Sequence, residues 1–260
     1  MTNIVEADHL VKHYPGSAQP AVRGMSFAVR RGEIFGFLGP NGAGKTTIIS
    51  MLSCLLKPSG GCATIAGFDL IRQPNDIKRR VRFVSQKPVR YPRLSIQANL
   101  LVYGCLHGVN GKQLKQRVEE VLMLVGLDAC CHNRVDKLAS GAQRRISLAA
   151  ALLHQPEILL LDEPTVNIDP QSRGFILNTV AELNRRGLTV VYATDDSTEA
   201  ERLCQRVALI DQGRIVALDT PRALQDMLGD LAAPVILEPK LEAVFLALTG
   251  KRFGCLTPDE

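Results

Sequence analysis

The strand–loop–helix segment around GPNGAGKT (39–46) constrains the fold of this chain more than any other feature. The apolar run EIFGFL (33–38) precedes it, and a predicted helix from Gly44 to Leu55 follows it. The pattern G-x-x-x-x-G-K-[ST] in this context predicts a loop whose backbone N–H groups surround phosphates at a helix N-terminus. We therefore expect a nucleoside triphosphate to bind at Gly39, Pro40, Asn41, Gly42, Ala43, Gly44, Lys45, Thr46 and Thr47.

Two side chains of this loop are expected to contact the phosphates and the metal ion. Lys45 is expected to reach the β- and γ-phosphates, and the Thr46 hydroxyl to ligate Mg²⁺. The alternative is a glycine-rich turn that matches the pattern by accident. The strand before the loop and the helix after it disfavour that alternative.

The second motif is ILLLDEP (158–164), an apolar run that ends in two carboxylates. Asp162, directly after the predicted strand, is expected to hold Mg²⁺ beside the phosphate loop. Glu163 is expected to accept a proton from the attacking water and is the candidate catalytic residue. Taken alone, Asp-Glu could equally be a turn or the acidic start of a helix; the phosphate loop favours the catalytic interpretation.

Apolar runs alternate with helical patterns over much of the chain. The segment EILLLDEP, a helix at 171–186, the strand TVVYAT (189–194), a further helix and RVALIDQGRIVAL (206–218) form such a series. This alternation predicts a mostly parallel sheet wrapped by helices. Further strands are expected within 3–38 and at CATIAGFDL (62–70) and VRFVS (81–85).

Residues 94–154 have a different periodicity, in which helices dominate. Within KQLKQRVEEVLMLVG (112–126) one helical face carries the apolar side chains, and Gly126 is a candidate C-terminal cap. The apolar residues of that face are Leu114, Val118, Val121, Leu122 and Val125. We expect a separate helical subdomain here, and two short helices joined by GDLAAPVILEP (229–239) near the end of the chain.

Charge and cysteine content narrow the class of protein. The net charge of +5 is small for 260 residues, and the basic clusters KRRVR (78–82) and QRR (143–145) are short. They suggest solvated faces or anion contacts rather than a nucleic-acid surface, and no nucleic-acid partner is expected. The seven cysteines lack zinc-ligand spacing and predict reduced side chains in the cytosol. No signal peptide and no membrane-spanning run is expected.

Taken together, the landmarks of the chain resemble the nucleotide-binding subunit of an ABC transporter along nearly the whole length. ALDTPRAL and PKLEAVFLALTGK are similar to the branch that drives small-molecule and drug exporters. The other landmarks, in chain order, are HYPG (13–16), GPNGAGKTT, RFVSQ (82–86), LASGAQRRISLAAALLHQPEILLLDEPT (138–165) and NIDP (167–170).

The resemblance implies an α/β fold of the P-loop NTPase (RecA-like) class. Its mostly parallel sheet is expected to carry an antiparallel β subdomain and an inserted helical subdomain. Residues 1–260 would form a single ABC ATPase domain. Within it, we expect a nucleotide-binding core at 1–87 and 156–218, the helical subdomain with the signature at 88–155, and a C-terminal helical tail at 219–260.

The resemblance also assigns roles to three residues outside the two motifs. Tyr14 would stack on adenine, Gln86 would contact Mg²⁺ and sense a membrane partner, and Asp169 would lie at the interface of two nucleotide-binding domains. Individually they could be a packed aromatic, a polar residue at a strand end and a helix cap. Their order along the chain favours the assigned roles.

The signature of the family, Leu-Ser-Gly-Gly-Gln, is altered in this chain. Without a gap it aligns with LASGA (138–142), so Ala139 replaces the signature serine, followed by Ser140 and Gly141. A register shifted by one residue recovers Ser140-Gly141-Ala142-Gln143 but needs a deletion before Arg144. In the ungapped register, which we favour, a hydroxyl that should contact the γ-phosphate of the partner's ATP is missing.

The acidic pair Asp195-Asp196, after the strand ending at Thr194, raises a separate question. Such a pair can be a catalytic dyad, a metal site or the start of a helix. In the family this strand ends in Thr-His, and the histidine contacts the γ-phosphate. Asp195 therefore stands in the γ-phosphate loop in place of a histidine. Asn167, where glycine is usual, is a smaller departure.

The sequence therefore predicts an ATPase that converts ATP and water to ADP and phosphate, with ATP and Mg²⁺ as cofactors, and that hydrolyses slowly. Its partners would be an integral-membrane permease, through which a substrate is exported, and a second nucleotide-binding domain on the same or a different kind of chain. We expect it in the cytoplasm, peripheral on the cytoplasmic face of the cell membrane.

Two rival functions remain at this stage. One is a hydrolysis-impaired, ATP-binding regulatory subunit paired with an active sister ATPase, which the altered signature and Asp195 favour. The other is a soluble ABC protein of DNA repair or translation. The single phosphate loop and the compact helical insertion disfavour that second rival.

Overall fold

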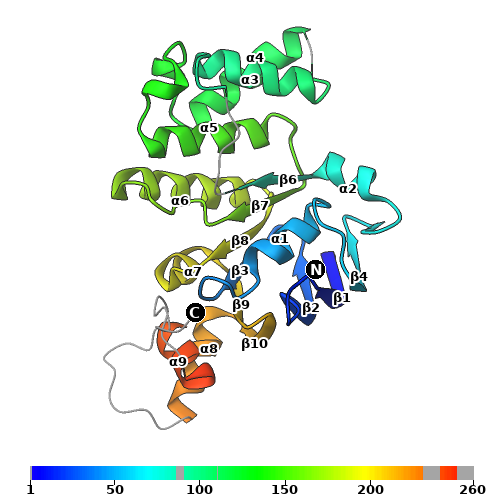
Figure 1. Ribbon diagram of the computed structural model, residues 1–260. Helices are drawn as coiled ribbons and strands as arrows, with labels where there is room; N and C mark the ends of the chain where they lie inside the picture. The colour runs from blue at the N-terminus through cyan, green and yellow to red at the C-terminus, as the bar shows by residue number, and fades with distance from the viewer. Residues whose placement is uncertain (1, 86–90, 110, 231–240, 251–260) are drawn as a thin grey trace.

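The computed structural model describes residues 2–85, 91–109, 111–230 and 241–250. Within these residues a six-stranded sheet forms the centre of the molecule (Figure 1), with β10 antiparallel to its neighbour and the other pairs parallel. In spatial order its strands are β10 (Arg214–Asp219), β9 (Arg206–Asp211), β3 (Ile34–Leu38), β8 (Thr189–Thr194), β7 (Ile158–Asp162) and β6 (Val81–Val84). This is the mostly parallel sheet that the alternating pattern predicted.

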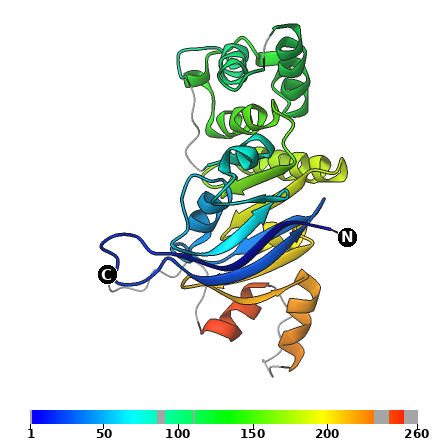
Figure 2. The same ribbon diagram turned by 90° about the vertical axis from the view of Figure 1, so that its right-hand side faces the viewer.

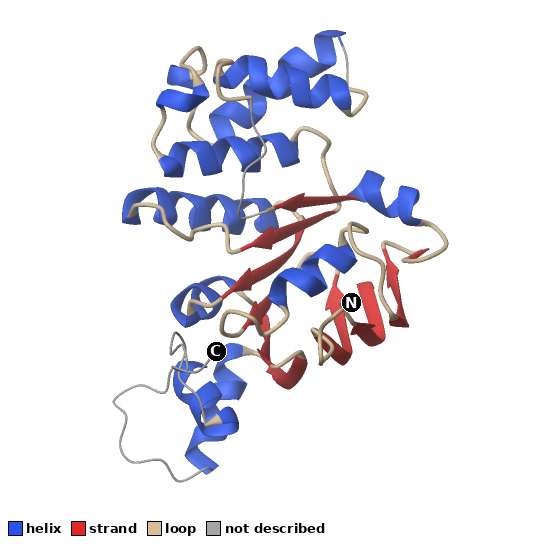
Figure 3. Cartoon of the chain, viewed as in Figure 1, coloured by secondary structure: helices blue, strands red, loops and turns tan. Residues whose placement is uncertain are grey.

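The central strands are continuous apolar runs because both faces of the sheet are covered. Every residue of β3, β7 and β8 is buried. Successive side chains of a strand point to opposite faces, and the two hydrophobic cores follow that alternation. Leu159 and Leu161 belong to one core, Ile158 and Leu160 to the other. Helices α1 (Lys45–Leu52), α2 (Pro74–Arg80), α6 (Pro170–Arg185) and α7 (Ser197–Leu203) surround the sheet (Figure 3).

An antiparallel sheet packs beside this core, with the long strands β1 (Asn3–Lys12) and β2 (Val22–Arg30) prominent in Figure 2. Its order is β2-β1-β4-β5, with β4 at Gly60–Ile65 and β5 at Phe68–Asp69. The strand expected at 62–70 is therefore a tight hairpin. Ala66 and Gly67 both have positive φ, 51° and 84°, as a two-residue hairpin turn requires.

Helices form a separate layer at the top of Figure 1, as the changed periodicity predicted. They are α3 (Ile96–Leu106), α4 (Gly111–Leu124) and α5 (Ser140–Leu152), with the short 3₁₀ turns η1 (Asp128–Cys130) and η2 (Val135–Lys137) between α4 and α5. The expected apolar face of α4 is buried in the larger core. Gly126 follows this helix with a φ of 62°, which only glycine adopts without strain.

The last described elements are α8 (Pro221–Asp230) and α9 (Leu241–Thr249), at the opposite end of the molecule from the helical layer (Figure 1). Helix α9 is tied to α7, because the Leu241 amide donates to the Glu201 carboxylate at 2.6 Å. Of the helices that the structure describes, none combines the length and the apolar character that crossing a bilayer requires.

Candidate functional site

The phosphate loop lies between the end of β3 and the start of α1, as the sequence predicted. Gly44 caps α1 with a φ of 104°, and its carbonyl accepts the first helical hydrogen bond, from Ile48 at 3.0 Å. A Cβ at Gly44 would lie 2.6 Å from the Ala21 carbonyl oxygen. Only glycine fits here, because a side chain would be both strained and in collision. Lys45, Thr46 and Thr47 form the first turn of α1.

The Lys45 ammonium is held inside this loop. Its Nζ donates to the carbonyl oxygens of Gly39 at 2.6 Å and Pro40 at 3.0 Å. It also lies 3.2 Å from Oε1 of Glu163, with the side chains 4% and 7% exposed. The structure therefore brings together a positive charge from the phosphate loop and the carboxylate predicted to act as the base.

The two carboxylates after β7 reach the loop through the register of the parallel sheet. Asp162 pairs with Ala193 of β8, and the Glu163 amide donates to the Ala193 carbonyl at 2.9 Å. Glu163 has a φ of 45°, in the left-handed region that non-glycine residues rarely occupy. Backbone strain of this kind gathers at functional sites, and here it turns the side chain of Glu163 toward Lys45.

Asp162 is prepared for a cation. Its side chain is buried, 2% exposed. Burial raises the pKa of its carboxyl, while a hydrogen bond with the Thr46 hydroxyl opposes the rise. Among the described residues, Oδ1 of Asp162 has no hydrogen-bond partner. A buried carboxylate oxygen without a donor, beside a hydroxyl, suits a hard divalent cation such as Mg²⁺.

The end of β8 completes this edge of the sheet. Thr194 pairs with Leu38 of β3, and its carbonyl accepts from the Gly39 amide at 3.4 Å. Asp195 follows, partly exposed, and has no hydrogen bond or ion pair within the described chain. The structure thus places the residue at the expected histidine position next to the phosphate loop.

Asp196, the second member of the acidic pair, is a helix cap. Its Oδ1 accepts from the amides of Thr198 at 2.9 Å and Glu199 at 3.1 Å, so it begins α7. Asp196 is therefore occupied as a helix cap and by its ion pair with Arg173, whereas the Asp195 side chain makes neither contact. Asp-x-x-Glu at 196–199 is the kind of spacing that signals a helix start.

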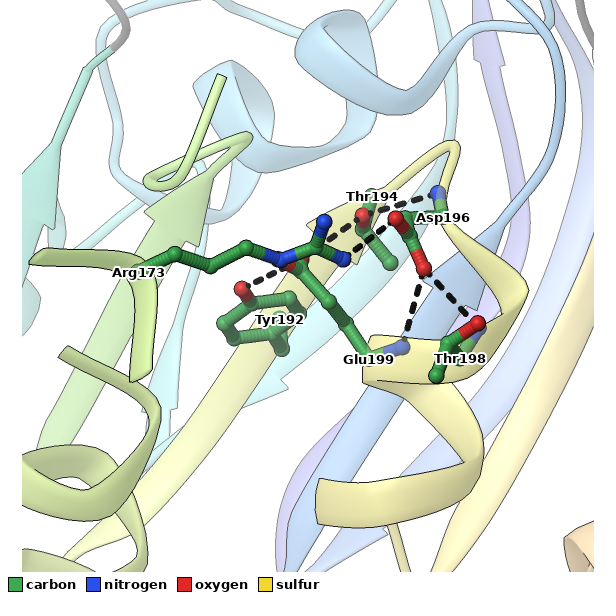
Figure 4. Close-up of polar contacts among 6 residues, drawn as sticks. All are labelled: Arg173, Tyr192, Thr194, Asp196, Thr198 and Glu199. Carbon is green, nitrogen blue, oxygen red and sulfur yellow. Dashed lines mark hydrogen bonds and ion pairs between the residues drawn. The ribbon is translucent and has the colours of Figure 1, made fainter. Parts of the chain in front are cut away.

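Sequence reasoning missed a partly buried polar network around Glu199, at the end of β8 and the start of α7, shown in Figure 4. The Glu199 carboxylate, 1% exposed, accepts from the Tyr192 hydroxyl at 2.8 Å and the Thr194 hydroxyl at 3.1 Å. Arg173 of α6 pairs with Glu199 at 2.7 Å and with Asp196. The pKa of Tyr192 is raised well above its usual value by burial and by the Glu199 charge. The network fixes both neighbours of Asp195 to α6.

The altered signature lies at the start of α5. Ala139 occupies the N-cap position and offers no side-chain hydrogen bond, and the helix begins at Ser140. The Ser140 hydroxyl donates to the Asn167 carbonyl at 3.2 Å. Asn167 has a φ of 58°, which asparagine tolerates better than most residues. The backbone at position 167 is therefore left-handed even though asparagine stands there in place of glycine.

Gly141 and Asp169 belong to the same contact region. Asp169 caps α6 by accepting from the Ser172 amide at 2.8 Å, and hydrogen bonds from Ser172 lower the pKa of its carboxyl. A Cβ at Gly141 would lie 2.1 Å from Oγ and 2.3 Å from Cβ of Ser172. The signature helix and the predicted interface loop thus touch each other within one chain.

Of the two remaining candidates, one lies beside the loop. The Tyr14 ring is 39% exposed, and its hydroxyl lies 3.3 Å from the Thr47 hydroxyl oxygen. An accessible aromatic face next to the phosphate loop suits a stacked base. Gln86 lies outside the described residues.

Sequence comparison connects these features with known proteins. The family model described as "ABC transporter" matches residues 22–166, more than half of the chain. The linearmycin resistance ATP-binding protein LnrL of Bacillus subtilis (strain 168) is 41% identical, covering 87% of this chain and 72% of its own length. The daunorubicin resistance ATP-binding protein DrrA2 of Streptomyces coeruleorubidus is 37% identical, covering 92% and 73%.

Solved structures agree with the sequence comparison. An ATP-binding subunit of an ABC transporter superimposes with a TM-score of 0.81 at 25% identity, over 95% of this chain and 99% of that one. The dimeric ATP-binding cassette MJ0796, bound to ADP and phosphate, gives 0.74 at 25% identity, over 83% and 98%. The fold is therefore the P-loop NTPase fold expected from the sequence, and the chain belongs to the ABC transporter family as an ATP-binding protein.

Proposed function

We propose that this chain is the ATP-hydrolysing subunit of an exporter, and that it drives a separate membrane permease with the energy of ATP. The observation that carries the proposal is the meeting of three strand ends at one edge of the sheet. The phosphate loop after β3, Asp162-Glu163 after β7 and Thr194-Asp195 after β8 are joined there by backbone hydrogen bonds.

The residues at this edge of the sheet have separate roles in ATP binding and in hydrolysis. The amides of the loop and the Lys45 ammonium bind the phosphates, and Tyr14 stacks on the base. Phosphate oxygens compete with Glu163 for Lys45 when ATP binds. The released Glu163 carboxylate then accepts a proton from the water that attacks the γ-phosphorus, which yields ADP and phosphate.

Mg²⁺ fits the donors present. Asp162, with its unpartnered buried Oδ1, and the Thr46 hydroxyl would hold it, and Gln86 stays a predicted third contact. When bound, the ion neutralises charge on the phosphates. The raised pKa of Asp162 reflects the cost of burying its charge, which a cation lowers.

Export is supported by the names of similar proteins. Relatives include proteins of linearmycin and daunorubicin resistance and a fluoroquinolones export ATP-binding protein of Mycobacterium tuberculosis, 39% identical over 86% of this chain. We assign the chain to the branch of transporters that export drugs and other small molecules. The permease would hold it at the cytoplasmic face of the membrane, and a second nucleotide-binding domain would face Asp169 and the signature. The division into core, helical subdomain and tail at 87/88, 155/156 and 218/219 is part of this proposal.

A second candidate function is a hydrolysis-impaired, ATP-binding regulatory subunit that is paired with an active sister ATPase. Ala139 and Asp195 favour it. Each removes a group that contacts the γ-phosphate in the family, so hydrolysis would be slow. In a heteromeric pair each composite site would inherit one defect, because the γ-phosphate loop serves the ATP of its own chain and the signature serves the ATP of its partner. In a homodimer each site would inherit both.

Titration of the purified chain with Mg·ATP tests the central claim, since the phosphate loop is intact. A chain that folds but binds no ATP would exclude the proposal.

Membrane association tests the proposed permease partner. The chain should sediment with membranes that contain its permease and stay in the supernatant with membranes that lack it. Sedimentation with both kinds of membrane would contradict that part.

A further inference from the structure

The guanidinium of Arg173 contacts two carboxylates of the segment that carries Asp195 (Figure 4). Its Nε lies 2.7 Å from Oε1 of Glu199, and its Nη2 pairs with Oδ2 of Asp196. Arg173 belongs to the first turn of α6, whereas both carboxylates follow β8, and Asp196 is 23 residues away in the sequence. One side chain therefore joins α6 to the loop at the end of β8.

Glu199 depends on this contact because it is buried. Its side chain is 1% exposed, and a charge in such a place is costly unless it is paired. Its Oε2 accepts from the hydroxyls of Tyr192 and Thr194. Its Oε1 makes no hydrogen bond within the described chain and faces the charge of Arg173. One oxygen thus holds the end of β8, and the other faces α6.

Asp196 brings the second contact directly beside residue 195. Its Oδ1 accepts from two amides at the start of α7, while its Oδ2 pairs with Arg173. Its own amide donates to the Thr194 hydroxyl at 3.0 Å. The residues on both sides of position 195 are therefore linked to α6 through Arg173.

The same network reaches the loop of the predicted base. The Tyr192 hydroxyl, which donates to Glu199, also makes a hydrogen bond with the side chain of Thr165. Thr165 is buried and lies two residues after Glu163. A buried polar network whose members are paired is rigid. It therefore fixes the loop of the base relative to the loop of residue 195.

We propose that Arg173 is a positioning residue for ATP hydrolysis, which holds the loop after β8 to α6 so that residue 195 stays beside the γ-phosphate. The proposal rests on the proposed function. Both contacts of the guanidinium are with carboxylates of this chain, so Arg173 acts through the loop and not on ATP. Arginine suits this position, because its planar fork donates to two carboxylates at once, whereas a lysine ammonium is a point charge.

The test needs a variant that removes the link without leaving a buried charge. Arg173→Met alone would leave Glu199 unpaired and destabilise the fold. Both hydroxyls donate to Oε2 of Glu199, so the carbonyl oxygen of a glutamine can accept both. In urea, Arg173→Met/Glu199→Gln should therefore be more stable than Arg173→Met. Arg202→Met is the matched control, because Arg202 joins the far end of α7 to Asn178 of α6 at 2.7 Å.

Amide hydrogen exchange of the nucleotide-free full chain measures the position of the loop directly. In Arg173→Met/Glu199→Gln, the amides of Asp196 and Thr198 should exchange on the order of tenfold faster than in the native chain, because the ion pair that holds their loop is lost. In Arg202→Met they should exchange at the native rate. Native exchange in the double variant would overturn the positioning role, whatever the ATPase rate.

The ATPase rate of the assembled transporter separates positioning from stability. Arg173→Met/Glu199→Gln should lower kcat on the order of tenfold with Mg·ATP affinity unchanged, and Arg173→Lys should retain part of the rate because its charge remains. A purely structural residue predicts the opposite, namely a native kcat in the double variant, whose stability is regained; that result would overturn the proposal.

The Asp195→His background gives a second check. The gain in rate expected from that substitution should disappear when Arg173→Met/Glu199→Gln is added, and an equal gain with and without Arg173 would contradict the proposal. A native chain that binds no Mg·ATP would instead contradict the proposed function. In that case the exchange rates of Asp196 and Thr198 still decide whether Arg173 positions the loop.

Discussion

The Lys45 ammonium lies 3.2 Å from Oε1 of Glu163, and both side chains are nearly inaccessible to solvent. The lysine predicted to bind phosphate and the predicted base therefore form an ion pair with each other in the nucleotide-free chain. In the proposed mechanism these two groups are needed in different contacts, so Lys45 would exchange Glu163 for phosphate oxygens when ATP binds.

Lys45→Ala should weaken Mg·ATP binding on the order of 10–150-fold, because hydrogen bonds to charged groups contribute about 1.5–3 kcal/mol. Lys57→Ala, at an exposed lysine, is the matched control and should bind as the native chain does. Isothermal titration measures both. Native affinity in Lys45→Ala would exclude the assigned role of this lysine.

Asp195→His should raise the ATPase rate of the assembled transporter with little change in ATP affinity. A histidine can donate to the γ-phosphate, whereas an ionised aspartate only accepts. Like charges about 4 Å apart also repel by roughly 4 kcal/mol at an effective dielectric of about 20, which Mg²⁺ and Lys45 would screen in part. One aimed donor changes turnover by on the order of 10²–10³ in other enzymes.

The control for that comparison is Glu163→Gln, which should be inactive in either background. A fast native rate that Asp195→His lowers would show that the aspartate is adapted to its role rather than a loss.

Ala139→Ser should stabilise the chain by roughly 0.5–2 kcal/mol, because Ala139 is at the N-cap of α5 and lacks a capping hydroxyl. Chemical unfolding measures this change. In the ungapped register the same substitution also raises the ATPase rate, while Ser140→Ala leaves the rate unchanged. If Ser140→Ala lowers the rate and Ala139→Ser has no effect on it, the shifted register is correct.

Gly141→Ala should destabilise the chain by about 1–3 kcal/mol, because the added Cβ would lie 2.3 Å from the Ser172 Cβ. Rotation of the serine does not relieve a contact with its Cβ. Ser172→Gly removes the opposing atoms, so the double variant should be more stable than the sum of the single effects predicts. If the changes in unfolding free energy of the two single variants, measured in urea, add up to that of the double variant, the two residues do not contact each other.

Acid should destabilise the chain through His154. Its pKa is about 4 in the folded state against 6.5 normally, so the unfolded chain binds more protons between these values. Stability is then complete above about pH 6.5 and falls as the pH drops toward 4. In His154→Gln, the loss of unfolding free energy between pH 6.5 and pH 4 should be smaller by roughly 1 kcal/mol. This figure is lower than the full pKa shift implies, because the side chain is partly exposed to solvent. His132→Gln, at an exposed site, should follow the native curve.

The sequence was sufficient for the elements whose periodicity or motif is local. The apolar runs of β3, β7 and β8, the phosphate loop and the cap at Gly126 are examples. Boundaries that depend on single backbone angles were not predictable. The helix expected to reach Leu55 ends at Leu52, where Cys54 has a φ of 57°.

Contacts between distant segments also escaped the sequence. Arg173 and Glu199 are separated by a whole strand and carry no motif of their own, yet they meet at 2.7 Å. The same holds for Lys45 and Glu163, whose pairing depends on the order of strands in the sheet. Such pairs follow from topology, which residue patterns specify only indirectly.

The network around Glu199 gives position 195 an unusual freedom. Thr194 and Asp196 are fixed by hydrogen bonds to Glu199 and by the ion pair with Arg173, while the side chain of residue 195 makes none of these contacts. The hydrogen bonds and the ion pair that hold this loop therefore do not depend on the side chain at position 195. Aspartate and histidine codons differ by one nucleotide, so a single base change exchanges these two side chains at position 195 without breaking the hydrogen bonds of the loop.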